Sequence, residues 1–120
     1  MKELTKAEEQ IMQVLWKIEK GFANDIMAHI PEPKPAYNTA LTVVRILEKK
    51  GFVDHETFGK AHRYYPLISK EDYSSSLLKN FAKKYFNNSF KSMVSFFASN
   101  HDISLEELEE IRKSIEEQEQ

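Results

Sequence analysis

Residues 52–66 constrain the fold of this chain more than any other segment, because their pattern is that of a β-hairpin. Two runs rich in β-branched and aromatic residues, 52–58 and 62–65, flank the turn signal Gly59-Lys60-Ala61. Gly51 stands directly before the first run, where glycine is typical of the end of a helix. The sequence therefore predicts a helix that ends at Gly51, followed by a hairpin that turns at Gly59.

Three helical patterns precede this hairpin. Thr5 and Glu8 have the spacing of a capping box, and an apolar stripe then repeats every three or four residues as far as Gly21. A second pattern covers residues 22–30 and is stopped by the prolines that follow, and a third covers residues 36–50. Three short helices and then a two-stranded hairpin is the order of a winged helix-turn-helix.

Three more helical patterns follow the hairpin. The first begins at Ser69, which forms an N-cap pair with Asp72. The second begins at Phe90, and the last begins at Ser104. The predicted fold class is therefore mostly α with a small β-hairpin. We expect a winged-helix DNA-binding domain over residues 1–68 and a helical dimerisation region over residues 69–120.

The last three helices carry many large apolar residues for so short a segment. We expect part of this set to bury against a second copy of the chain in a homodimer, because two or three added helices cannot enclose it. The alternative is that the aromatic residues form a core within one protomer. The predicted interface residues are Leu77, Phe81, Phe90, Met93, Val94, Phe97, Leu108 and Ile111.

Composition removes several classes of protein. The chain has 120 residues and no cysteine, which excludes a disulfide scaffold, a Cys-ligated zinc site and a thiol nucleophile. No apolar run approaches the ~20 residues that span a bilayer, and we expect a cytoplasmic protein. The net charge is -2, but residues 34–63 carry 6 basic groups against 3 acidic ones. An anionic partner should therefore bind in that segment.

The third helix has the residues that reading of duplex DNA requires. Tyr37, Asn38, Thr39 and Thr42 lie near its start and can reach base edges, whereas Arg45 and Lys49 suit phosphates. On the hairpin, the candidate phosphate contacts are Lys60, His62 and Arg63. The alternatives are an ordinary solvated helix face, pairing of the helix cations with Glu48 or Asp25, and edge-strand charges that prevent sheet pairing.

Neither a metal site nor catalysis is indicated. His55, His62 and Glu56 form no ligand set, because strand alternation puts Glu56 on the opposite face from His55. Ser74–Ser76 lie in no nucleophile elbow or oxyanion loop. We therefore expect no enzyme activity, no metal, no cofactor and no small-molecule substrate.

Several segments together resemble the penicillinase-repressor family of regulators. They are Leu4-Thr5-Lys6-Ala7-Glu8, Ala36-Tyr37-Asn38-Thr39, Leu47-Glu48-Lys49-Lys50-Gly51 and Gly59-Lys60-Ala61-His62-Arg63-Tyr64. The resemblance implies a homodimeric transcriptional repressor whose winged helices bind a palindromic operator in duplex DNA. A winged-helix module that binds proteins without DNA is the alternative.

The resemblance also implies a mode of release. In the family, a membrane sensor protease leads to cleavage of the repressor within its dimerisation helices, and the matching bond here joins Phe96 to Phe97. This chain has Phe96 where characterised members of the family have Asn. It also lacks the cysteine motif of the family's copper-sensing branch.

Overall fold

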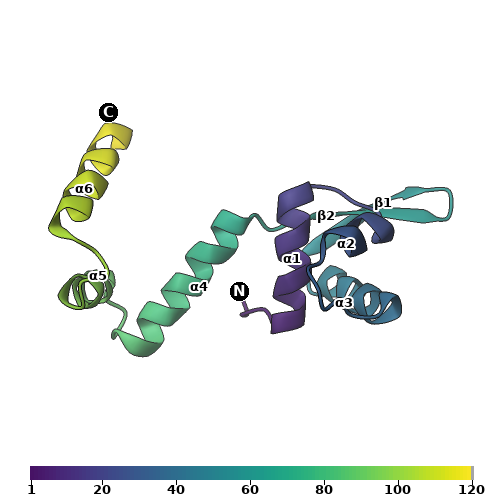
Figure 1. The fold of residues 1–120 in the computed structure, drawn as a ribbon, viewed down its shortest axis with the longest axis horizontal. Helices are drawn as coiled ribbons and strands as arrows, with labels where there is room; N and C mark the ends of the chain where they lie inside the picture. Colours follow the sequence, from purple (N-terminus) through teal and green to yellow (C-terminus); the bar gives the residue numbers. More distant parts are fainter. Residues whose placement is uncertain (120) are drawn as a thin grey trace. The chain divides into compact units, whose positions relative to one another are not determined.

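A computed structural model describes residues 1–119, and its elements follow the predicted order (Figure 1). The elements are α1 (Lys6–Ile18), α2 (Ala23–His29), α3 (Tyr37–Lys49), β1 (Val53–Phe58), β2 (Ala61–Pro66), α4 (Lys70–Tyr85), α5 (Phe90–Ser99) and α6 (Leu105–Glu119). The predicted class, mostly α with a small hairpin, is confirmed. No helix within residues 1–119 is both long enough and apolar enough to cross a membrane.

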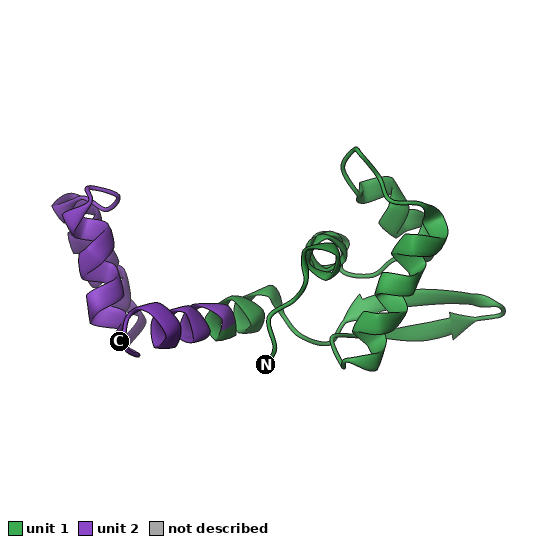
Figure 2. Ribbon diagram, turned by 90° about the horizontal axis from the view of Figure 1, so that it is seen from below, with its two compact units in different colours: residues 1–76 green, residues 77–120 purple. Residues whose placement is uncertain are grey.

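The chain divides into two compact units (Figure 2), Met1–Ser76 and the residues from Leu77 onward. The predicted boundary at residue 68 marks the approach to α4, whereas the units divide later, within that helix. The first turns of α4 belong to the N-terminal unit because Tyr73 is buried there. Its hydroxyl accepts a hydrogen bond of 2.9 Å from the backbone N–H of Leu4, and its ring packs 5.8 Å from that of Trp16.

Residues next to its two ends determine where α1 begins and ends. The Thr5 hydroxyl accepts from the backbone N–H of Glu8 at 3.2 Å, and the Glu8 carboxylate accepts from that of Thr5 at 2.8 Å. This is the predicted capping box. The helix ends at Ile18, before the predicted Gly21, with Glu19 in a left-handed conformation (φ 70°). Gly21 has a different role, because a Cβ there would lie 2.6 Å from the Ile18 side chain.

The core of the N-terminal unit lies between the three helices and the base of the hairpin. Its fully buried side chains come from every one of these elements, and they are Ile11, Met12, Leu15, Ile26, Ile30, Val44, Leu47 and Val53. Glu8 is buried beside them and its carboxylate pairs with Lys50 at 2.7 Å. Burial alone would raise the pKa of Glu8, but hydrogen bonds from Lys50 and Thr5 outweigh it and hold that pKa below its usual value.

The hairpin is antiparallel, with His55 opposite Tyr64, Glu56 opposite Arg63 and Thr57 opposite His62. Gly59 in the turn has a φ of 61°, the left-handed conformation that its predicted role requires. Gly21 extends the pairing: it exchanges two backbone hydrogen bonds with Tyr64, at 2.9 and 2.8 Å. The loop after α1 thus fixes the hairpin to the helices.

The second unit consists of the rest of α4 together with α5 and α6. Ser89 caps α5 by accepting from the N–H of Ser92 at 3.1 Å, and Ser104 and Glu107 form the predicted capping box of α6. Only Ala82 and Met93 are buried apolar residues among those described after Leu77. Most of the large apolar side chains of this unit are therefore exposed within one chain.

Candidate nucleic-acid interface

One face of α3 is free of the core. Asn38, Thr42, Arg45 and Lys49 follow one another at helical spacing, and all four are exposed. The Thr42 hydroxyl donates to the carbonyl oxygen of Asn38 at 2.8 Å, which holds it against its own helix. The described residues show no ion pair to Arg45 or Lys49, so the alternative role of these cations, pairing with Glu48 or Asp25, does not appear in the structure. Thr39, also predicted, is exposed on an adjoining part of the helix.

A hollow of about 280 Å³ separates α3 from the hairpin. It brings four predicted site residues together: Tyr37 and Arg45 from α3, Lys60 from the turn, and His62 from β2. The other lining residues are Phe22, Ala23, Asn24, Leu41, Ala61 and Tyr64. The described residues supply no carboxylate to this lining. The hollow therefore presents cationic and hydrogen-bonding groups between two elements that are distant in sequence.

Behind His62, a histidine stack connects the hairpin to α3. The rings of His55 and His62 are nearly parallel, at 8°, with centroids 4.0 Å apart. His55 Nδ1 lies 2.8 and 2.9 Å from the two carboxylate oxygens of Glu48, near the end of α3. Burial raises the pKa of the adjacent Tyr64, and the charge of Glu48 raises it further.

The sequence did not indicate the contact between Glu48 and His55, because nothing in residue spacing joins a helix to the following strand. Asp54 belongs to the same cluster, in which Glu48, Asp54 and His55 bring ligand-type atoms within 4.8 Å of one another. These side chains already make hydrogen bonds within the cluster. The Glu48 carboxylate accepts from the His55 ring, and the Asp54 carboxylate accepts from the His55 backbone N–H at 2.8 Å. The cluster is thus held together by hydrogen bonds of its own residues.

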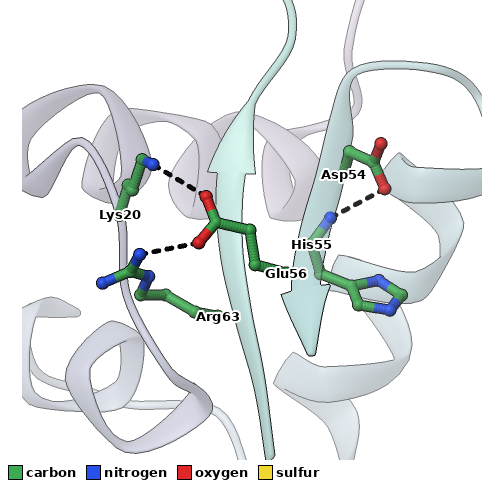
Figure 3. A network of polar contacts seen from close by, with 5 residues as sticks. All are labelled: Lys20, Asp54, His55, Glu56 and Arg63. Atoms are coloured by element: carbon green, nitrogen blue, oxygen red, sulfur yellow. Dashed lines mark hydrogen bonds and ion pairs between the residues drawn. The ribbon is translucent and has the colours of Figure 1, made fainter. Parts of the chain in front are cut away.

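Arg63 does not join the hollow. Adjacent residues of a strand point to opposite faces, so Arg63 lies on the face away from His62. There the Glu56 carboxylate accepts from Arg63 at 2.6 Å and from Lys20 at 2.8 Å (Figure 3). These two hydrogen bonds, that of Lys20 first, hold the pKa of Glu56 below its usual value. The Arg63 guanidinium also lies 4.8 Å from the centre of the Phe58 ring.

Figure 3 shows Glu56 and the ring of His55 on opposite sides of β1, as the sequence predicted. The three predicted phosphate contacts of the hairpin, Lys60, His62 and Arg63, stay predictions, and the structure divides them between two faces. Lys60 and His62 line the hollow, whereas Arg63 is held by Glu56 on the other face. The same alternation that separates Glu56 from His55 separates Arg63 from His62.

The predicted dimer residues lie in a largely open set of apolar side chains. Phe81, Phe90, Val94, Phe97 and Ile111 are exposed, and Leu77 and Leu108 are half-buried. Met93 differs, because it is 9% exposed and so is already buried by its own chain. Further apolar residues of this unit are also exposed, although the sequence pattern did not assign them to the interface: Leu78, Tyr85, Leu105 and Ile115.

The predicted cleavage bond lies inside α5. The Phe96 side chain is 53% exposed and that of Phe97 is 38% exposed. The carbonyl of Phe96 accepts from the backbone N–H of Asn100 at 3.1 Å, and its ring packs 5.6 Å from that of Phe86. The side chains are accessible within one chain, while the bond between them is part of a hydrogen-bonded helix.

Solved structures resemble the N-terminal unit. The solution structure of the DNA binding domain of the repressor BlaI matches with a TM-score of 0.52 at 28% identity, over 61% of this chain and 94% of that one. The solution structure of the Bacillus licheniformis BlaI monomeric form in complex with the blaP half-operator matches with a TM-score of 0.51 at 27% identity, over 60% of this chain and 89% of that one.

Whole-chain comparisons extend the similarity beyond this unit. The methicillin resistance regulatory protein MecI of Staphylococcus aureus (strain N315) is 32% identical over 114 residues, which are 94% of this chain and 93% of that protein. The penicillinase repressor of Bacillus licheniformis is 28% identical over 116 residues, 96% of this chain and 91% of that protein. A family model described as penicillinase repressor matches residues 4–117. The chain belongs to the penicillinase repressor family.

Proposed function

We propose that this chain is a transcriptional repressor that binds duplex operator DNA through α3 and the hairpin. The observation that carries the proposal is the hollow between them, into which Arg45, Lys60 and His62 converge beside the exposed face of α3. An α-helix fits the major groove, and cations at its flank suit the phosphates that border the groove. Family membership and the relative solved with its half-operator support the same partner.

The roles of the residues follow from their positions. Asn38 and Thr42 read base edges, since both are short, polar and exposed near the start of α3. Arg45, Lys49 and Lys60 neutralise phosphates, and Tyr37 contributes a base or phosphate contact from the rim of the hollow. Arg63 has a different role, because its contact with Glu56 fixes the hairpin and occupies its charge.

The repressor acts as a homodimer on a palindromic operator. Exposed apolar side chains from Leu78 to Ile115 supply a surface that a second copy of the chain would cover. Two copies would place two recognition helices in successive major grooves, about one helical turn apart. Linking the two half-sites in this way multiplies the affinity of each winged unit.

Release follows proteolysis in α5 by the action of a membrane sensor protease, and the candidate bond joins Phe96 to Phe97. Cutting there would detach α6 and the last turn of α5, from Phe97 onward, from the apolar surface that the homodimer needs. The cut requires local opening, because the bond lies in a hydrogen-bonded helix. Mass spectrometry of the protein from cells exposed to a cell-wall antibiotic should find an N-terminal fragment that ends between residues 94 and 100. Intact protein that has left its operator would contradict proteolytic release.

Footprinting on the promoter beside this chain's own gene tests the central proposal. A palindromic footprint is expected, and Asn38→Ala should weaken it by roughly 1–3 kcal/mol while relaxing preference at one base pair of each half-site. Lys60→Gln should weaken binding to all sequences alike. No binding to any duplex at low salt would favour a protein-interaction module.

A further inference from the structure

We propose that His62 takes up a proton when the winged unit binds DNA, and that His55 and Glu48 position it for this role. The inference rests on the proposed function, because the phosphate that His62 meets belongs to the duplex bound by α3 and the hairpin. It adds a regulatory property to that function: the affinity for DNA increases as the pH falls from 8 to 6.

His62 lies where it can meet a phosphate of bound DNA. Its side chain lines the hollow with Arg45, Lys60 and Tyr37, the groups that face a DNA backbone phosphate in the proposed complex. A neutral imidazole can donate one hydrogen bond there, whereas an imidazolium adds a positive charge and a stronger, charge-assisted bond to a phosphate oxygen. Histidine is the side chain whose ordinary titration falls in the physiological range.

The described groups that line the hollow with His62 are cationic or neutral. Arg45 and Lys60 line the same hollow, together with the neutral hydroxyls of Tyr37 and Tyr64. The anionic groups of this region, Glu48 and Asp54, lie beside His55. The described lining of the hollow therefore offers an imidazolium at position 62 no anionic partner. A phosphate in the hollow supplies the missing negative charge, so DNA binding and proton uptake favour each other.

His55 and Glu48 orient the His62 ring. The carboxylate of Glu48 only accepts hydrogen bonds, so its contact with His55 Nδ1 requires the proton on that nitrogen and fixes the tautomer of His55. The plane of His55 then lies against that of His62 at 4.0 Å and 8°. Because Glu48 belongs to α3 and His62 to β2, the stack also couples the recognition helix to the hairpin. His55 and Glu48 are positioning residues and need not touch DNA.

The test is fluorescence anisotropy of the full chain with a labelled duplex from the promoter beside its own gene, at constant ionic strength from pH 5.5 to 8.5. The wild type should bind about three- to tenfold tighter per protomer at pH 6 than at pH 8, because each protomer takes up a proton when it binds. The slope of log K against log salt should also become steeper by about 0.9 per protomer at pH 6, since one more phosphate is neutralised.

Two substitutions at position 62 bracket the expected result. His62→Gln, which has no titratable group, should bind with the same affinity at pH 6 as at pH 8. His62→Lys, which carries a permanent charge, should bind at pH 8 as tightly as the wild type does at pH 6, without pH dependence. His29→Gln and His101→Gln are controls outside the hollow and should keep the wild-type profile, and Lys60→Gln should lose affinity equally at both pH values.

The positioning role has its own readout. His55→Phe keeps a flat ring against His62 and should keep most of the pH dependence, whereas His55→Gln should lose most of it. A wild-type affinity that does not change between pH 6 and 8, or a His62→Gln variant with the wild-type profile, would overturn the inference. Binding at pH 8 would then still support the proposed function, whereas absence of binding at every pH would overturn both.

Discussion

The N-terminal unit and the region after Leu77 use their apolar side chains in opposite ways. Of the buried apolar residues that the structure describes, 14 lie in Met1–Ser76 and 2 lie beyond it. Of the exposed large apolar residues, 5 lie in the first unit and 10 in the second. The first unit thus buries its own core, whereas the second leaves most of its large apolar side chains exposed. A second copy of the chain is the partner that the proposed function assigns to it.

This difference separates the stability of the two units. The core of the winged unit involves α1, α2, α3 and the hairpin of one chain, so its free energy of unfolding should not depend on protein concentration. A region completed by a second copy should be more stable at higher concentration, because association and folding are linked there. Four substitutions test this difference between the units.

The largest effect is expected from Phe97→Asp, which places a charge in the exposed apolar set of the second unit. Sedimentation should show monomers, and operator affinity should fall by about 10²–10⁴-fold because the two half-sites are no longer linked. Leu67→Asp is the matched control, since it introduces the same charge at an exposed leucine of the first unit. A Phe97→Asp protein that stays dimeric would refute the assigned interface.

Leu47→Ala tests the core of the winged unit. Leu47 is fully buried in α3, so truncation should lower the free energy of unfolding by about 2–5 kcal/mol. The loss should be equal at low and high protein concentration when the winged unit is followed by tryptophan fluorescence of Trp16. A loss that grows on dilution would show that this unit also depends on a second copy.

Tyr73→Phe tests where the two units divide. The variant keeps the ring that packs near Trp16 and Phe52 but leaves the buried N–H of Leu4 without its acceptor. We expect a loss of about 1–3 kcal/mol, the cost of an unsatisfied buried donor, in urea unfolding of the winged unit. Tyr85→Phe, at an exposed tyrosine later in α4, should change nothing. Equal effects would place the start of α4 outside the winged unit.

Glu8→Gln should have the smallest effect and a specific pH dependence. The pKa of Glu8 is lowered in the folded chain, so its stabilisation is complete above the ordinary carboxyl pKa of about 4.3 and is lost as the pH falls through the folded value. Because Lys50 is partly exposed, we expect about 0.5–1 kcal/mol at pH 6. Urea unfolding from pH 6 to 3 should show wild type and variant converging in acid. Glu9→Gln, at an exposed neighbour, should follow the wild type throughout.

Local features of the fold could be predicted because their physical causes lie within a few residues. The capping boxes at Thr5 and Ser104 and the turn at Gly59 depend on side chains next to the backbone groups that they satisfy. The end of α1 was predicted less well. A glycine after an apolar stripe indicated a helix end at Gly21, but Glu19 adopts the left-handed conformation and Gly21 is needed where Ile18 packs close.

Three features could be predicted because each is a periodic pattern along the chain: the order of helices and strands, the polar face of α3, and the excess of apolar residues after Leu77. Tertiary structure decided which residues meet across elements. It brought Glu48 to His55, stacked His55 on His62, and turned Arg63 towards Glu56 and away from the hollow. The physical reason is that such contacts depend on strand register and on how a helix packs against a strand, and residue spacing within one element carries no record of either.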